Sequence, residues 1–285
     1  MAGNFWLRIF DVEHGACALM VSPTGERIAM IDSGHNATTG FRPSAYIRLS
    51  LKRTTLDYLF ITNADQDHLS DLEGLWEYGI DVRVAHRNRS PEASILRTIK
   101  EKQGELTNDI ERFLKVHAEY TGPIPVAFND GMGGVEVVTF ANSYPQFQDT
   151  NNLSQVVFIK YAGVSFLFPG DLEKDGWCAL LQNPKFVAEL LTVDVLMASH
   201  HGRTNGYSED AFKFCQPRVV VISDKPIAHS TQETVPDYRC IIKGDGVSVR
   251  NVTRLRHVLT TRCDGDIIFT VDPSGNGFWI DTSKR

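Results

Sequence analysis

Short apolar runs alternate with polar, glycine-containing loops along most of the chain. Runs with a period of two, or short continuous runs of Val, Ile, Leu and Phe, predict β-strands. We expect strands at residues 5–12, 16–22, 27–31, 57–61, 82–85, 135–140, 154–161, 164–168, 193–198, 218–222, 257–260, 267–271 and 277–280.

Other segments repeat apolar residues at helical spacing. Pro43 opens one such segment, and Ser90-Pro91-Glu92 begins a longer one that Gly104 divides in two. We expect helices at 43–52, across 90–118 in two parts, and at 173–181, 185–191 and 208–215. Residues 223–240 predict a polar loop that holds His229.

The order of these elements favours a layered α+β fold. Two β-rich blocks, 5–61 and 135–168, each pass into mixed helix and strand sequence. Two sheets packed face to face with helices outside would bury both apolar faces. Polar loops follow several of the apolar strands, so loops at one rim of such a sandwich can bring their side chains into one site.

Composition narrows the class of protein. The chain has 285 residues, 42% hydrophobic and 22% charged, and a net charge of −6. This charge argues against a surface that binds nucleic acid everywhere, although a local basic patch would be compatible with it. Five cysteines without a paired spacing indicate reduced thiols. We find no signal-peptide pattern and no apolar run near the ~20 residues of a membrane helix, so we expect a cytoplasmic protein without a membrane partner.

Residues 62–72 carry the most distinctive chemistry. Asn63, Asp65, Asp67 and His68 follow the predicted strand that ends at Ile61, and Leu69 and Leu72 continue at helical spacing. Carboxylates and an imidazole so close together are costly unless a positive charge lies among them, and a divalent metal is the usual solution. The alternative is an ordinary helix start with Asp67 as its N-cap.

The ordered motifs of the chain resemble those of metallo-β-lactamase-fold hydrolases, most closely the soluble hydrolase domain of ComEC-type competence proteins. The segments that carry the resemblance are Phe10–Gly15, Ile31–Gly34, Asn63–His68, Asn151–Ser154, Phe166–Asp171, Ser199–Gly202, His229 and Cys263–Ile267. The resemblance implies a single αββα domain over residues 1–285. The segments least like the family are 223–240 and a helical insert at about 86–134. DNA uptake is not implied, because the membrane channel of competence proteins is not among these segments.

The family motif normally reads His-x-(His or Asp)-x-Asp-His, and its residues serve two metal sites. The resemblance implies one complete site made by Asp67, His68 and a bridging Asp171, with His229 or His200 as the last ligand. The other site departs from the pattern, because Asn63 stands in place of its first histidine, Asp65 holds its second position, and no histidine stands at Asn151-Asn152.

The departure suggests a hypothesis about the metal. We expect one firmly bound divalent ion and a weaker, oxygen-rich site at Asn63 and Asp65. At that weaker site, oxygen ligands favour Mn²⁺ or Mg²⁺ over Zn²⁺. For the whole protein, the expected cofactor is one or two divalent ions, Mn or Zn, with Mg as a third choice.

The same resemblance suggests catalytic and supporting roles. Asp67, His200 and His201 are the catalytic candidates, with His200 either a ligand or the proton donor to the leaving group and one of the two histidines alternatively structural. Asn152 either orients a substrate oxygen or is a turn residue, and Asp32 supports the metal ligands. We assign the remaining histidines to structure or solvent: His14, His35, His86, His117 and His257.

These inferences predict a metal-dependent hydrolase that cleaves a phosphodiester in nucleic acid or a nucleotide. Arginine runs at 83–89 and 250–262 would suit such a substrate if they flanked the site, although a solvated face is the default. One alternative is an ester, amide or lactone hydrolase of the same fold. Another is a catalytically weak binding module, and the insert at 86–134 is a candidate surface for a protein partner.

Overall fold

Two mixed β-sheets form the centre of the computed structural model, which describes residues 3–284. The first sheet has the order β15 (Phe278–Thr282), β14 (Ile267–Val271), β1 (Phe5–Ile9), β2 (Ala18–Val21), β3 (Ile28–Ile31), β5 (Tyr58–Phe60) and β7 (Ala85–His86). The second has the order β13 (Val258–Thr260), β12 (Val219–Ile222), β11 (Val195–Met197), β10 (Val164–Phe168), β9 (Gln155–Tyr161) and β8 (Glu136–Ala141). A separate pair joins β4 (Thr55–Leu56) to β6 (Asp81–Val82).

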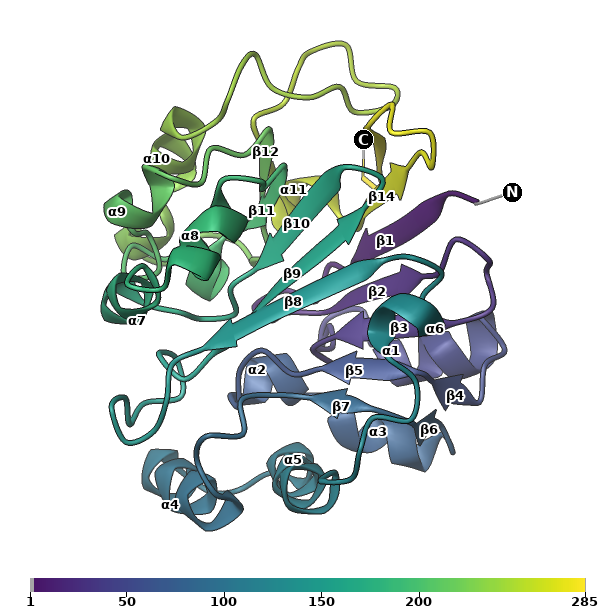
Figure 1. The fold of residues 1–285 in the computed structure, drawn as a ribbon, viewed down its shortest axis with the longest axis vertical. Helices are drawn as coiled ribbons and strands as arrows, with labels where there is room; N and C mark the ends of the chain where they lie inside the picture. The colour runs from purple at the N-terminus through teal and green to yellow at the C-terminus, as the bar shows by residue number, and fades with distance from the viewer. Residues whose placement is uncertain (1–2, 285) are drawn as a thin grey trace.

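Helices cover the outer faces of the two sheets (Figure 1). Those in the first part of the chain are α1 (Pro43–Ala45), which continues as a π-helix over Tyr46–Ser50, α2 (Gln66–Leu69), α3 (Leu72–Glu77), α4 (Ala93–Gln103), α5 (Asn108–Glu119) and α6 (Phe128–Gly131). Those in the second part are α7 (Lys174–Leu180), α8 (Pro184–Leu190), α9 (Glu209–Phe212), α10 (Val235–Cys240) and α11 (Thr261–Asp264), with 3-10 turns at Ser199–Gly202 and Ser230–Gln232.

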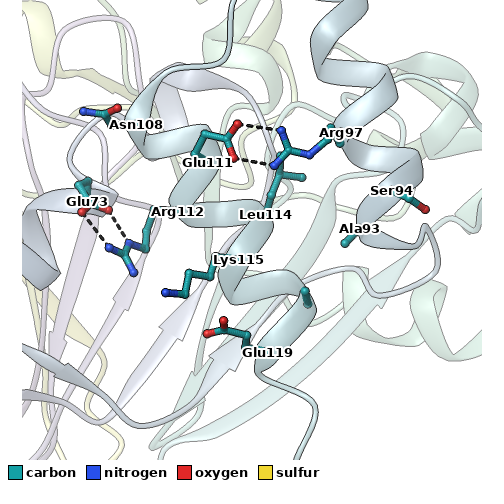
Figure 2. A pocket seen from close by; sticks show the side chains of 11 residues that line it. Glu73, Ala93, Ser94, Arg97, Asn108, Glu111, Arg112, Leu114, Lys115 and Glu119 are labelled. Atoms are coloured by element: carbon teal, nitrogen blue, oxygen red, sulfur yellow. Dashed lines mark hydrogen bonds and ion pairs between the residues drawn. The ribbon is translucent and has the colours of Figure 1, made fainter.

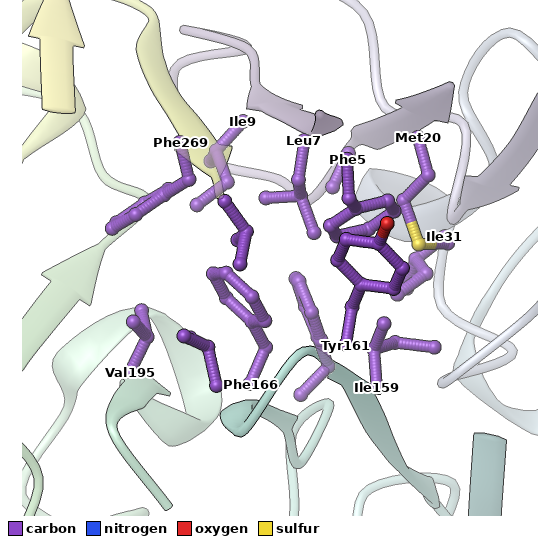
Figure 3. Close-up of a cluster of buried hydrophobic side chains, with 14 of the residues drawn as sticks. Phe5, Leu7, Ile9, Met20, Ile31, Ile159, Tyr161, Phe166, Val195 and Phe269 are labelled. Carbon is purple, nitrogen blue, oxygen red and sulfur yellow. The ribbon is translucent and has the colours of Figure 1, made fainter. Parts of the chain in front are cut away.

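The core between the sheets follows from the alternation of side chains along each strand. In β9, Val157 and Ile159 face the other sheet, whereas Val156 and Phe158 face the helices outside. Figure 3 shows side chains from β1, β2 and β3 meeting those of β9, β10 and β11. Phe166 lies at the centre, with its ring 6.2 Å from that of Phe5 and 5.4 Å from that of Phe269.

Two further apolar clusters attach the helical layers. Leu72, Leu96 and Phe113 of α3, α4 and α5 pack with residues of the first sheet such as Met30 and Leu59. Trp177 and Phe186, with other residues of α7–α10, pack against the second sheet. Four layers result, so the predicted αββα sandwich is confirmed.

Most predicted elements lie close to those of the structure, and the strands at 164–168 and 267–271 have the expected bounds. The strand expected at 82–85 is wrong, because two short strands, β6 and β7, form there in different sheets. The expected loop at 223–240 is wrong in its second half, because α10 forms there and buries Tyr238 completely. Val235, Tyr238, Ile241 and Ile242 carry the helical spacing that signals it. The single-domain organisation over residues 1–285 stays a prediction, and positions 1, 2 and 285 lie outside the described residues.

The region expected as an insert contains α4, α5 and α6. Leu96, Ile110 and Phe113 belong to the same cluster as Ile61 and Leu69, so α4 and α5 lie against the strand-to-helix turn that carries the metal motif. Among residues 3–284, none of the helices combines the length and the apolar character needed to span a bilayer.

Parallel pairing brings the polar loops to one rim of the sandwich. β3 and β5 pair in parallel in the first sheet, and β10, β11 and β12 pair in parallel in the second. The loops after their carboxyl ends therefore lie at one edge of each sheet. The two edges are joined where the Gln155 backbone N–H donates to the Thr62 carbonyl at 2.7 Å.

Replacing Phe166 by Ala tests the inter-sheet core. Phe166 is 1% exposed, and deleting a buried phenylalanine ring costs about 3–5 kcal/mol of unfolding free energy because a cavity remains. Denaturant unfolding measures the change. Leu191→Ala is the control: Leu191 is 67% exposed, so its loss should change the free energy by less than about 0.5 kcal/mol. Equal effects of the two variants would contradict this description of the core.

Candidate metal centre

Four side chains from both sheets converge at the shared rim. Asp67, His68, Asp171 and His201 each place one potential ligand atom within 4.8 Å of the others. Nε2 of His68 lies 2.9 Å from Oδ1 of Asp171, and Nε2 of His201 lies 3.1 Å from Oδ2 of Asp67. Asp67 and His68 follow β5, Asp171 follows β10 and His201 follows β11, so each half of the chain contributes two groups.

Hydrogen bonds from the opposite side of each ring fix the two imidazoles. Nδ1 of His68 lies 2.9 Å from Oδ2 of Asp32, and Nδ1 of His201 lies 3.1 Å from the carbonyl of Ser223. Both acceptors require a proton on Nδ1, which leaves the lone pair of Nε2 directed to the cluster. Asp32 is itself held by the backbone N–H and hydroxyl of Thr62, at 2.7 and 2.5 Å. This is the supporting role expected for Asp32.

The charges of the cluster favour a cation. Burial opposes ionisation of Asp67 and Asp171, but the imidazoles of His201 and His68 outweigh it, and the pKa of each carboxyl is lowered. Burial likewise opposes a charged His68, but Asp171 and Asp32 raise its pKa well above the ordinary value. Two ionised carboxylates in a buried site therefore require compensating positive charge.

A divalent metal fits this set of groups. Nε2 of His201 is buried and forms no hydrogen bond, although it lies 3.5 Å from Asp171 as well as close to Asp67. Burial opposes a charged His201, but Asp171 and Asp67 raise its pKa, so a divalent ion bound there would replace a proton at this buried nitrogen. Two imidazole nitrogens and two carboxylate oxygens suit Zn²⁺ or Mn²⁺, and the residues do not decide between them.

The backbone that presents these groups uses close approaches and left-handed conformations. A methyl group on Gly15 would lie 2.6 Å from the carbonyl oxygen of Asp67, and one on Gly34 would lie 2.7 Å from the same atom. His200 and His201 have φ of 50° and 53°. Such conformations are costly for residues with a Cβ and are found where a site over-determines them. The glycines of two family motifs thus allow loops to pack directly on Asp67.

An open cavity of about 560 Å³ leads to the cluster. Its wall includes Asp67, Asp171 and His200, together with His14, His35, Asn151 and Lys225. A larger cavity of about 680 Å³ lies on the outer surface between α4 and α5 (Figure 2). There Arg97 pairs with Glu111, and Arg112 pairs with Glu73. That surface holds ion pairs and no histidine, so it offers no metal centre.

His200 and His229 differ from the residues of the cluster. The resemblance offered either as the last ligand, but the structure brings His201 to that position. His200 lies beside it, with Nε2 3.9 Å from Oδ2 of Asp171 and Nδ1 3.4 Å from Glu173. His229 is exposed in the loop after β12, where its backbone N–H donates to Oε1 of Gln232 at 3.0 Å. The structure does not bring His229 to the cluster.

The residues predicted to form the oxygen-rich metal site, Asn63 and Asp65, form hydrogen bonds with other protein side chains. Asp65 accepts hydrogen bonds from Lys100 and Thr150, and Asn63 donates to Asn151. Neither belongs to the four-residue cluster. Asn152 is buried, and its Oδ1 accepts from the backbone N–H of Glu173 and Gly176 at 3.3 and 3.0 Å. These bonds hold the start of α7, which favours the structural alternative for Asn152.

His14 lies at the cluster, although we assigned it to structure or solvent. Its ring centroid is 4.4 Å from that of His201, and its Nε2 lies 3.6 Å from Oδ2 of Asp67. Burial and the nearby His201 lower the pKa of His14 to about 4, so the ring is neutral and accepts from Arg203 at 3.2 Å. His14 stands next to Gly15 in one of the segments that carry the family resemblance, and this position was the signal available in the sequence.

The arginine runs have other positions. Arg256 pairs with Asp264, and Arg262 pairs with Asp224. Arg83, Arg87 and Arg89 line a separate cavity of about 200 Å³. Most of these arginines therefore serve local structure.

Comparison with known families agrees with the geometry. The family model described as the metallo-beta-lactamase superfamily matches residues 11–211. The chain therefore belongs to the metallo-β-lactamase superfamily, and the resemblance seen in its motifs is confirmed. The matched range contains all four residues of the cluster, and the fold is that of metal-dependent hydrolases.

Two individual proteins are similar to this chain. ComE operon protein 3 of Bacillus subtilis (strain 168) is 26% identical over 172 residues, which are 59% of this chain. The match spans only 20% of that protein's length. The metallo-beta-lactamase fold protein YhfI from Bacillus subtilis has a similar structure, with a TM-score of 0.52 over 93% of this chain and 99% of YhfI. At 9% identity this likeness shows the fold alone.

Replacing His201 by Ala tests the cluster directly. Loss of a group that only orients a ligand lowers metal affinity by about 10–100-fold, so loss of His201 should lower it by at least about 100-fold. Calorimetric titration of metal-free protein with Zn²⁺ or Mn²⁺ gives the affinity. His229→Ala is the matched control and should leave affinity unchanged. The opposite result, with His229 essential and His201 dispensable, would restore the ligand suggested by the motif order.

Proposed function

We propose that this protein is a metal-dependent phosphodiesterase whose substrate is nucleic acid or a nucleotide. The observation that carries the proposal is that two residues of the cluster, Asp67 and Asp171, form part of the wall of an open cavity of about 560 Å³. Lys225 lines the same cavity, and Arg203 contacts His14 beside it. A bound divalent ion with two basic side chains nearby suits an anionic substrate.

Four side chains would hold the ion: Asp67, His68, Asp171 and His201. A divalent ion bound there supplies Lewis acidity and lowers the pKa of water. Asp32 and the carbonyl of Ser223 keep the proton of each imidazole on Nδ1, so both Nε2 atoms stay available as ligands. The buried position of these groups also limits competition from bulk water.

His200 is the proposed proton donor to the leaving-group oxygen. It lines the cavity next to Asp171, and Glu173 lies 3.4 Å from its Nδ1. Glu173 is in turn held by Asn151 at 3.0 Å and Asn205 at 2.7 Å. Burial lowers the pKa of His200, which makes the protonated ring a stronger acid and a minor species at neutral pH. The carboxylate of Glu173 favours the protonated form of the ring, in which Nε2 carries the proton for the substrate.

A substrate screen tests the proposed reaction. We expect Mn²⁺- or Zn²⁺-loaded protein to hydrolyse bis-p-nitrophenyl phosphate faster than p-nitrophenyl esters, because the double negative character of the transition state gains most from the cationic site. Asp67→Asn should abolish this turnover. A second screen with single-stranded DNA, RNA and cyclic dinucleotides then identifies the class of natural substrate.

The other outcomes of the screen separate the alternatives. Faster cleavage of esters or lactones than of phosphodiesters would contradict the proposal and favour a different hydrolase of the same fold. No turnover of any substrate, in metal-loaded protein and Asp67→Asn alike, would indicate a binding module.

Replacing His200 by Asn tests the proton donor. General acid catalysis contributes about 10²–10⁴-fold, so kcat should fall by about that factor with a leaving group of high pKa. With p-nitrophenolate, which needs little protonation, the decrease should be much smaller. Bound metal, measured by elemental analysis, should stay unchanged. A variant that lost its metal would instead identify His200 as a ligand.

A further inference from the structure

Lys100 is a buried lysine with a specific partner. It is one of two buried residues of α4 and is 7% exposed. Its Nζ lies 2.6 Å from Oδ1 of Asp65, and the hydroxyl of Thr150 donates to the same oxygen at 2.8 Å. Lysine is rarely buried unless it is paired, because the ammonium loses its hydration. Asp65 is therefore the partner whose negative charge stabilises the buried ammonium of Lys100.

The carboxylate of Asp65 is directed to Lys100 and not to the helix that follows. Asp65 occupies the N-cap position of α2 with extended backbone angles, yet its side chain makes no capping hydrogen bond. N-cap carboxylates ordinarily accept from the first turn of the helix. The charge of Asp65 is thus committed to an ammonium ion that comes from a different part of the chain.

Asn63, the other residue of the expected oxygen-rich site, is also fully engaged. Its Oδ1 accepts from the backbone N–H of Asp65 at 3.1 Å, and its Nδ2 donates to Oδ1 of Asn151 at 3.1 Å. Nδ2 of Asn151 donates to Glu173. The oxygen of Asn63 is used, and its nitrogen is a donor that faces no cation.

We propose that the protein holds a single divalent ion, at the cluster of Asp67, His68, Asp171 and His201, and that the ammonium of Lys100 takes the place of a second ion at Asn63 and Asp65. A second divalent ion would have to share a carboxylate already bound by a cation, and the two positive charges would repel. The other groups bonded to the side chains of Asn63 and Asp65 are the neutral Asn151 and Thr150. They offer no charge to compensate for that repulsion, and Glu173 lies beyond Asn151.

This arrangement gives the helical insert at 86–134 a role in the site. Lys100 comes from one of the two segments that resemble the family least, and in this proposal its ammonium stands where a second ion would bind Asn63 and Asp65. It is a positioning residue: it fixes Asp65, which is two residues before the ligand Asp67, and it adds a fixed positive charge beside the centre.

Metal stoichiometry tests the proposal, which rests on the metal centre of the proposed function but not on its substrate. Metal-free protein is dialysed against excess Mn²⁺ or Zn²⁺, and bound metal is measured by elemental analysis. We expect one ion per chain, with the six-line electron paramagnetic resonance spectrum of an isolated Mn²⁺. Two ions per chain, or an exchange-coupled spectrum, would overturn the proposal and leave metal-dependent hydrolysis intact. No bound ion would overturn both.

Variants of the pair show whether Lys100 is responsible. Asp65→Asn should keep one ion but lower the melting temperature by roughly 5–10 °C, because it leaves a buried ammonium unpaired. Asp65→Asn with Lys100→Met should recover most of that loss. Lys100→Met alone should admit a second, weaker ion, since it frees Asp65.

The exposed Lys102 of the same helix supplies the matched control, and Lys102→Met should change neither the metal count nor the melting temperature. Loss of an ion in Asp65→Asn would show that Asp65 is a ligand and would overturn the proposal. So would a Lys100→Met protein that binds one ion as before and melts at the same temperature.

Discussion

The mutual attraction of two buried carboxylates and two imidazoles is the constraint on which the rim of this protein depends. Asp67 and Asp171 are ionised in a site that excludes most water, so each needs positive charge at short range. Without a metal, protonated His68 and His201 provide that charge, and a divalent ion that displaced their Nε2 protons would provide it instead. Three features bring these four groups together. They are the glycines that pack on Asp67, the left-handed backbone conformation of His200 and His201, and the contact between Asp32 and His68.

The sandwich makes that convergence possible. Asp67 and His68 stand on a loop of the first sheet, and Asp171 and His201 stand on loops of the second. The core around Phe166 holds the sheets face to face, and the bond from Gln155 to Thr62 aligns their rims. The geometry of the centre is therefore a property of the inter-sheet contact as much as of the loops.

Much of this could be predicted from the sequence, because strand alternation and ordered motifs are local signals. Asp67, His68 and Asp171 lie on short, recognisable turns, and the structure brings them together. The choice between His200 and His201 could not be made, because two consecutive left-handed residues decide which ring faces the cluster. The position of His229 depends on a long loop without periodicity.

His14 and Lys100 illustrate the second limit of sequence inference. Each reaches the site from an element distant in the chain, so its place there follows from the tertiary arrangement. Lys100 did carry one local signal: it lies four residues after Leu96, on the face of α4 that is buried. A charged residue on the apolar face of a helix indicates a buried partner, and here the partner is Asp65.

The distribution of the four groups along the chain has a consequence for the free energy of unfolding. One bound ion would cross-link Asp67 and His68 to Asp171 and His201, which lie more than 100 residues further along the chain. Such a cross-link restricts the unfolded chain and binds only the native one, so the resistance of the protein to heat and proteases would rise with the concentration of free metal. A shortage of metal would thus shorten the lifetime of the folded protein as well as remove any activity that depends on the ion.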